Sequence, residues 1–270
     1  MKFYRSLKII IILCFFSFQI SAKDEVLRLA ITKTVENSGS NRFFLDAIIS
    51  SFNLILDIDA ALFSIVITSL KVSFTAVFIA SLIGIPLGII VALNEFGGKK
   101  LLLISLNSLM ALPTVVIGLI LYGILNRQGL LGDMALLYTP TAIITGLCIL
   151  VIPIIWNLTI SAVSSTDPRL ANTCKSLGAT QTQRVFIYIS ETRFALITAI
   201  VTGFGRAIGE VGIAMMLGGN IQGFTRTMTT AIALETSKGA FEFALALGII
   251  LLLVAFFINI LLQYFQLKIR

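Results

Sequence analysis

Long uncharged apolar runs dominate this chain and alternate with short polar segments. Four of these runs cover residues 72–93, 101–126, 134–166 and 243–267. A helix of about 20 apolar residues crosses the ~30 Å hydrocarbon core of a bilayer, so each run is long enough to span a membrane. The runs are too long and too continuous for barrel strands. The pattern therefore predicts an all-α polytopic membrane protein.

A fifth apolar run contains charged residues and is still predicted to span, because its ends fit the topology of the other runs. Its charged residues are Glu191, Arg193, Arg206 and Glu210. The five predicted spans cover residues 61–93, 101–125, 139–163, 185–217 and 243–266. Prolines within three spans predict kinks, at Pro86, Pro113 and Pro153. Small residues predict close helix approach, at Gly84, Gly88, Gly118 and Gly123.

Residues 1–22 have the layout of a secretory signal peptide. Lys2, Arg5 and Lys8 precede the apolar sequence IIIILCFFSF, and small residues end at Ala22. The alternative is an uncleaved anchor helix. Both place residue 23 outside the cytoplasm, and the spans then place residues 94–100, residues 167–184 and the C-terminus inside. These inner segments hold most of the flanking lysines and arginines, as the positive-inside rule expects.

A short polar helix is predicted at residues 168–177, between two spans. Asp167 is a good N-cap, Pro168 suits the first helical position, and Gly178 is a natural stop. Leu170, Cys174 and Leu177 are spaced to form one apolar stripe. So short a helix is not stable alone in water and needs a partner surface. The alternative is a connector that packs on its own protein.

Composition agrees with a membrane protein and excludes several kinds of chemistry. The chain is 57% hydrophobic and 12% charged, with a mean hydropathy of +1.02. It has no histidine, its cysteines are scattered at Cys14, Cys148 and Cys174, and no phosphate-binding glycine loop occurs. His-based triads and His metal sites are therefore excluded, and no cofactor is expected on this chain. The net charge of +7 comes from residues spread among apolar spans, which favours membrane orientation over nucleic-acid binding.

Arg206 and Glu210 form the sharpest chemical feature within a span. Their i, i+4 spacing places both side chains on one helix face, where they neutralise each other. Charges within the bilayer are costly unless they are paired or face a cavity. Two interpretations stay open: Arg206 lies near a path for an anion, or the pair is a structural clasp between helices.

An outer loop rich in glycine and threonine follows this pair. Hydroxyls, backbone N–H groups and an arginine are groups that hold an oxyanion. The candidate residues are Asn220, Thr225, Arg226, Thr229 and Thr230. The alternative is an outer gate helix, about residues 225–235, that only contacts a binding protein.

The sequence LANTCKSLGATQTQRVFIYI resembles the EAA loop of ABC importer permeases. Gly178 and Ala179 match that pattern, whereas Asn172, Thr173 and Cys174 stand where the family has Glu-Ala-Ala. In that family the loop is the coupling helix that docks on a cytoplasmic ATPase. The resemblance assigns ATPase coupling to Leu170, Ala171, Cys174, Lys175, Leu177, Gly178 and Ala179.

Three further segments resemble the permease subunits of tungstate importers: SLKVSFTAVFIASLIGIPLGIIVAL, NSLMALPTVVIGLILYGIL and GFGRAIGEVGIAMMLGGNIQGFTRTMTTAIALETSKG. This resemblance implies a type I ABC importer permease fold with five core transmembrane helices over residues 61–270. It also implies a bacterial inner-membrane protein that is no enzyme by itself.

The same resemblance implies several partners. They are a dimer of ATPase subunits that bind ATP and Mg, an extracytoplasmic oxyanion-binding protein, a second copy of this chain and the lipid bilayer. Molybdate or sulfate is the alternative cargo. A self-sufficient channel or secondary carrier is the alternative of another class, but such a carrier has no need of a capped cytoplasmic helix.

The segment before the predicted permease domain has a different sequence pattern. Residues 23–41 begin with an alternating VLRLAI and continue as TKTVENSG, which resembles the start of a tungstate-binding protein. We expect a disordered remnant without ligand binding, because so short a segment cannot build a core. Residues 42–60 predict an interfacial amphipathic helix whose apolar residues are Phe44, Ile48, Phe52 and Ile55.

Overall fold

This computed structural model describes residues 39–56 and 60–268. The chain divides into two compact units, residues 1–53 and residues 54–270. The predicted signal or anchor segment, residues 1–22, and most of the predicted remnant, residues 23–41, lie outside the described residues.

Helix α2 (Gly39–Leu56) covers most of the predicted interfacial helix and starts three residues before it. Its buried residues are the small Ala47 and Ser51. Phe52 is 52% exposed, although the sequence places it on the same apolar stripe as Ile48 and Ile55, which are half-buried. Among the α2 side chains that the structure describes, the buried ones are therefore small and lie outside the predicted stripe, whose Phe44 is outside that described set.

The second unit is all helical over its described residues, which confirms the predicted fold class. Its helices are α3 (Ala60–Leu93), α4 (Lys99–Met110), α5 (Thr114–Leu125), η1 (Gly132–Met134), α6 (Pro140–Ser164), α7 (Pro168–Ser176), α8 (Gln181–Ile208), α9 (Gly212–Gly218), α10 (Met228–Ser237) and α11 (Phe241–Lys268). Four described helices are long and apolar enough to cross a membrane: α3, α6, α8 and the Phe241–Ile258 part of α11. The pair α4 and α5 provides a fifth if it counts as one span.

The second predicted span is not one straight helix. Helices α4 and α5 meet at a bend of 95°. Pro113 lies at this break, where it supplies no backbone N–H and restricts the residue before it. Pro86 and Pro153, by contrast, remain inside α3 and α6. Only one of the three prolines therefore breaks its helix.

The fourth predicted span, residues 185–217, is also interrupted. Helix α8 ends at Ile208, and α9 begins at Gly212 after a short non-helical stretch. The predicted outer helix begins at Met228 as α10, with Thr227 as its N-cap. Thr227 and Thr230 form a reciprocal capping box, which explains why the helix starts three residues later than residue 225.

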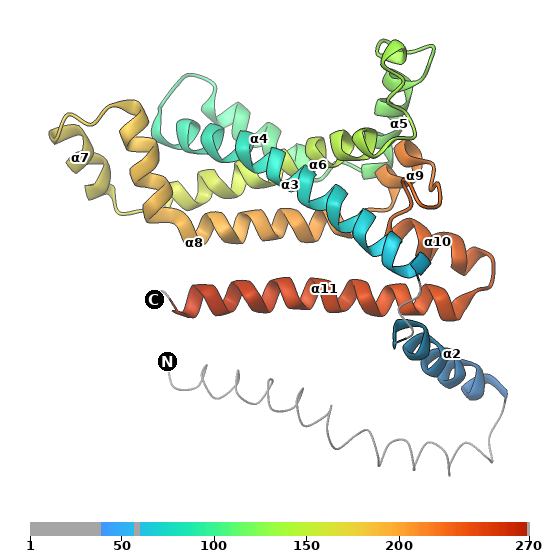
Figure 1. Ribbon diagram of the computed structural model, residues 1–270. Coiled ribbons are helices and arrows are strands. Elements are labelled where there is room, and N and C mark those ends of the chain that lie inside the picture. Colours follow the sequence, from blue (N-terminus) through green and yellow to red (C-terminus); the bar gives the residue numbers. More distant parts are fainter. Residues whose placement is uncertain (1–38, 57–59, 269–270) are drawn as a thin grey trace. The chain divides into compact units, whose positions relative to one another are not determined.

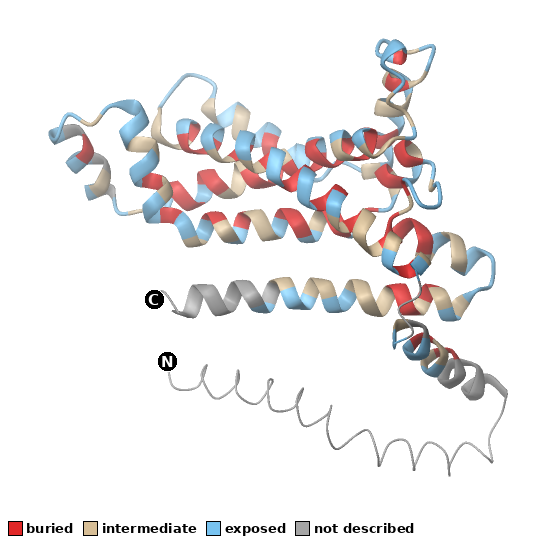
Figure 2. Ribbon diagram, in the orientation of Figure 1, coloured by how far each residue is buried: buried red, intermediate tan, exposed pale blue. Residues whose placement is uncertain are grey.

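Helices α3, α6 and α8 pack side by side and contain most of the core (Figure 1). Their buried residues lie where the three helices meet, and their other faces are exposed (Figure 2). A Cβ atom on Gly88 would lie 2.6 Å from the Cβ of Thr159 on α6. Glycine is therefore required there for close packing of two helices, the main source of helix association in lipid. Around Gly123, however, no atom of another described element lies within 4 Å of such a Cβ, so the predicted close approach is wrong at that position.

Candidate functional site

Helix α7 begins and ends where local sequence signals place its ends. A carboxylate oxygen of Asp167 accepts a hydrogen bond from the backbone N–H of Arg169 at 2.8 Å. At the other end Gly178 has a φ of +66°, and the N–H of Ala179 donates to the carbonyl of Cys174 at 2.9 Å. This is a Schellman stop, which requires the left-handed residue that glycine supplies. The predicted helix 168–177 is thus one residue longer than the observed helix.

The predicted apolar stripe of α7 divides between two environments. Cys174 is 2% exposed, and Leu170 packs against a cluster formed by Ile89, Val163 and Tyr188. Leu177 is 80% exposed. The first two residues hold the helix on its own protein, whereas Leu177 points away from this cluster. Gly178 is exposed and Ala179 is half-buried, and the side chains of Ala171 and Lys175 lie outside the described set.

Arg206 and Glu210 form an ion pair at the end of α8. The Nη1 atom of Arg206 lies 2.7 Å from Oε2 of Glu210, and their side chains are 39% and 4% exposed. The other carboxylate oxygen, Oε1, accepts hydrogen bonds from the N–H groups of Gly212 at 3.0 Å and Ile213 at 3.4 Å. Glu210 therefore binds both the last turn of α8 and the first N–H groups of α9, where negative charge is favoured.

The backbone around Glu210 connects two further helices. The hydroxyl of Thr229 on α10 donates to the carbonyl oxygen of Glu210 at 2.8 Å. The N–H of Met228 donates to the hydroxyl oxygen of Ser69 on α3 at 2.6 Å. Residue 210 and its neighbours thus form a polar junction of α3, α8, α9 and α10. This geometry matches the helix-clasp interpretation of the pair, and a role in the anion path stays a prediction.

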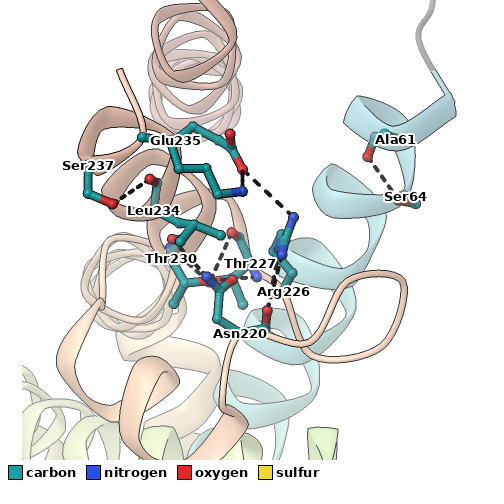
Figure 3. Close-up of polar contacts among 10 residues, drawn as sticks. Ala61, Ser64, Asn220, Arg226, Thr227, Thr230, Leu234, Glu235 and Ser237 are labelled. Carbon is teal, nitrogen blue, oxygen red and sulfur yellow. Dashed lines mark hydrogen bonds and ion pairs between the residues drawn. The ribbon is translucent and has the colours of Figure 1, made fainter. Parts of the chain in front are cut away.

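The outer-loop candidates mostly bind one another and the backbone (Figure 3). The guanidinium of Arg226 donates to the carbonyl of Asn220 at 3.4 Å and lies 3.9 Å from the carboxylate of Glu235. The amide of Asn220 donates to the carbonyl of Thr230 at 3.4 Å, and Thr230 caps α10 together with Thr227. These contacts hold the loop between α9 and α10 in place.

Thr225 completes this loop. Its hydroxyl donates to the carbonyl of Gly218 at 2.5 Å and accepts from the N–H of Ile221 at 3.0 Å. Thr225 and Thr230 are 0% exposed, and Thr229 is 7% exposed. The hydroxyls that sequence reasoning offered to an oxyanion are therefore buried and already paired in this structure.

An exposed polar face of α8 was missed by sequence reasoning. Successive residues of a helix are about 100° apart, so residues spaced by three, four or seven share a face. The exposed polar and glycine residues of one such face are Glu191, Thr198, Thr202, Gly205 and the C-cap Gly209, the partly exposed Arg206 completes it, and the exposed Ala195 lies among them. The signal was present as periodicity, but it consists mainly of hydroxyls and glycines rather than charges. We call this set the α8 polar face.

The described residues hold no candidate metal site. Among the described residues, no group of three or more histidine, cysteine, aspartate or glutamate side chains is placed to hold a metal. The arrangement consists of a spanning helix with one polar face, a braced outer end and a capped helix at the other end.

Comparison with known proteins gives the family. Residues 84–270 match the profile of the binding-protein-dependent transport system inner membrane component. The chain belongs to this family. The permease is accordingly a multi-pass inner-membrane subunit and is not itself catalytic.

Relatives of the permease include several anion transport proteins. It is 41% identical to the tungstate uptake system permease protein TupB of Peptoclostridium acidaminophilum, over 78% of this chain and 92% of that protein. It is 38% identical to the Campylobacter jejuni TupB, over 81% and 93% of the two chains. It is 29% identical to the molybdenum transport system permease protein ModB of Escherichia coli, over 62% and 76%.

A solved structure supports the architecture. A bacterial ABC transporter involved in the import of the acidic polysaccharide alginate matches with a TM-score of 0.55 and 19% identity, over 97% of this chain and 96% of that chain. At this identity the likeness shows the fold alone. The family and this fold together identify a type I importer permease, as predicted.

Proposed function

We propose that the permease forms the transmembrane path of an ATP-driven importer whose cargo is tungstate. This proposal rests on the similarity of the chain to two tungstate uptake permeases, each matched over at least 92% of its length. Relatives named for molybdenum and sulfate transport match at 29% identity or less, so these oxyanions are the second candidates.

The α8 polar face is the proposed lining of the path. Hydroxyls and glycines on a spanning helix offer a passing solute weak, exchangeable contacts. Lipid tails provide no hydrogen-bond partner for such polar groups, so this face is better suited to line a path than to face lipid. Thr198 and Thr202 donate to the carbonyls one turn earlier at 2.9 Å and 2.8 Å, so their oxygens present no unpaired donor to hold an anion tightly. Such a surface suits passage better than binding.

Arg206 lies at the outer end of this face and gives it a positive end. One of its guanidinium N–H groups is bound to Glu210, and the side chain remains 39% exposed. Guanidinium has several N–H groups in a planar fork, which leaves others to meet an oxyanion. Glu210 reduces the positive charge of the guanidinium, so an oxyanion would meet the remaining N–H groups without being held tightly.

The energy source in this proposal is a separate pair of ATPase subunits that bind ATP and Mg. Helix α7 is their docking element, with Leu177 as the exposed contact and Leu170 and Cys174 as its anchor. An extracytoplasmic binding protein delivers the oxyanion at the end formed by α9 and α10. A second copy of the permease completes the path by facing the α8 polar face.

The test is ATP hydrolysis by the assembled complex in vesicles, with the binding protein on the outer side. We expect tungstate to stimulate hydrolysis at lower concentration than molybdate, and sulfate to have the least effect. Stimulation by sulfate or molybdate with no response to tungstate would reassign the cargo. Oxyanion uptake into vesicles that contain the permease without any ATPase would instead show a carrier or channel.

A further inference from the structure

An apolar groove lies between α3, α8 and α11, away from the α8 polar face. Its volume is about 640 Å³. Residues of three helices line it, including Phe78 and Leu82 of α3, Leu196 and Ile200 of α8, and Ile258 of α11. On α8 the groove residues are rotated by roughly half a turn from the α8 polar face. The same helix therefore presents hydroxyls on one side and a wall of apolar side chains on the other.

One cation lies in this apolar lining. Arg193 of α8 lines the groove and is exposed. Its guanidinium stacks over the ring of Phe194 at 4.9 Å from the ring centre. Among the described residues, no acidic side chain lies within ion-pair distance of Arg193; Glu191 belongs to the opposite face of the helix. A guanidinium beside a hydrocarbon-lined groove is costly unless an anion meets it.

The position of Arg193 along the membrane indicates which anion is available. Arg193 lies eight residues after residue 185, the predicted cytoplasmic start of its span. At about 1.5 Å per residue this is about 12 Å from the predicted cytoplasmic end. The long side chain of arginine reaches from such a depth to the phosphate level of the inner leaflet.

We propose that this groove binds an anionic phospholipid of the cytoplasmic leaflet. The phosphate pairs with the guanidinium of Arg193, and an acyl chain lies along the apolar walls formed by α3, α8 and α11. The lipid supplies both chemistries that the groove requires, an anion at its cytoplasmic end and hydrocarbon beyond it. A lipid bound there fills the space between α11 and the other two helices.

Two other possible occupants would supply hydrocarbon to the groove but no anion for Arg193. The apolar N-terminal segment of the chain has Lys2, Arg5 and Lys8 at its predicted cytoplasmic end, which would repel Arg193. An apolar helix from a second copy would fill the walls but bring no anion. Charge complementarity therefore favours the phospholipid.

The test is native mass spectrometry of the purified full-length chain, titrated separately with phosphatidylglycerol and phosphatidylcholine. We expect phosphatidylglycerol to bind about fivefold more tightly, as one cation near an anionic lipid contributes. Arg193→Gln should abolish this preference, and Arg193→Lys should keep most of it. Lys100→Gln, which removes an exposed cytoplasmic cation outside the groove, should leave it unchanged. Ile200→Trp, which narrows the groove, should reduce retention of both lipids.

Several results would overturn the proposal. Equal affinity of the wild-type chain for the two lipids would show that the lipid's negative charge does not contribute to binding. An unaltered preference in Arg193→Gln would place the lipid elsewhere. Lipid retained by monomers and lost from dimers in the same spectra would assign the groove to a second copy. The binding measurement needs no transport, so it stands or falls independently of the cargo.

Discussion

At the scale of single residues, Gly88 sets how closely α3 approaches α6. A Cβ added there would lie 2.6 Å and 2.7 Å from two carbons of Thr159, so the helices must move apart. We expect Gly88→Ala to lower the free energy of unfolding by about 1–3 kcal/mol through overpacking. Thermal unfolding in detergent measures this. Gly123→Ala, where no atom of another described element lies within 4 Å, is the matched control, and equal losses in both variants would refute the packing argument.

Leu177 is the residue by which α7 is proposed to contact its ATPase. Because its side chain is 80% exposed, Leu177→Asp removes an apolar contact without disturbing the core. The variant should insert normally but lose co-purification with the ATPase and most of the uptake. Leu130→Asp, at a leucine that is 92% exposed near η1, is the control and should retain both. Normal uptake by Leu177→Asp would rule out this docking contact.

At the scale of elements, Glu210 connects α8 to α9, and its two carboxylate oxygens act differently. One binds Arg206 and the other accepts the N–H groups of Gly212 and Ile213. Glu210→Ala should therefore lower the melting temperature more than Arg206→Ala, since it leaves buried N–H groups unpaired at about 1–3 kcal/mol. The double variant should recover part of the combined loss, because Arg206→Ala alone leaves the buried Glu210 carboxylate without its charge partner.

The Lys99–Glu95 pair provides the matched control for this junction. It has the same i, i+4 spacing and the same 2.7 Å distance, but the Glu95 side chain is 88% exposed. The Lys99 side chain is only 16% exposed, but it also donates to the carbonyls of Ala92 and Asn94 and keeps these bonds when Glu95 is removed. A pair with a solvent-exposed carboxylate contributes about 0–1 kcal/mol, so Glu95→Ala should leave the melting temperature nearly unchanged. Strictly additive losses for Arg206 and Glu210 would argue against coupling between them.

Elements with local signals were predicted well, and those that depend on tertiary contacts were not. The ends of α7 follow from Asp167, Pro168 and Gly178, which act within a few residues of themselves. The break between α8 and α9 was missed because Glu210 stands within an apolar run, and only the folded chain shows its carboxylate bound to N–H groups beyond it. Periodicity placed Leu177 on a stripe, but neighbours distant in sequence decide that Cys174 is covered and Leu177 is not.

At the scale of the whole molecule, deletion of residues 24–41 tests whether the segment before the permease domain is needed for uptake. Most of them lie outside the described residues, and the sequence predicts a remnant without a pocket. Deleting them while keeping the signal sequence should leave uptake unchanged when a separate binding protein is supplied. Radiolabelled or mass-detected tungstate uptake in cells measures this. Loss of uptake by a variant that still inserts would give the segment a function.

The corner between α4 and α5 constrains the membrane that surrounds the protein. Ala111, Leu112 and Pro113 belong to neither helix and are exposed, about 18 Å along α4 from its predicted cytoplasmic start. The carbonyl of Pro113 accepts hydrogen bonds from the N–H groups of Val116 and Ile117. The carbonyls of Ala111 and Leu112 belong to no helix and cannot be left among acyl chains, because hydrocarbon offers them no hydrogen-bond donor. The annulus of lipid must therefore be interrupted at this corner. Either water or another protein surface reaches the middle of the bilayer there, and acyl chains are excluded from that sector.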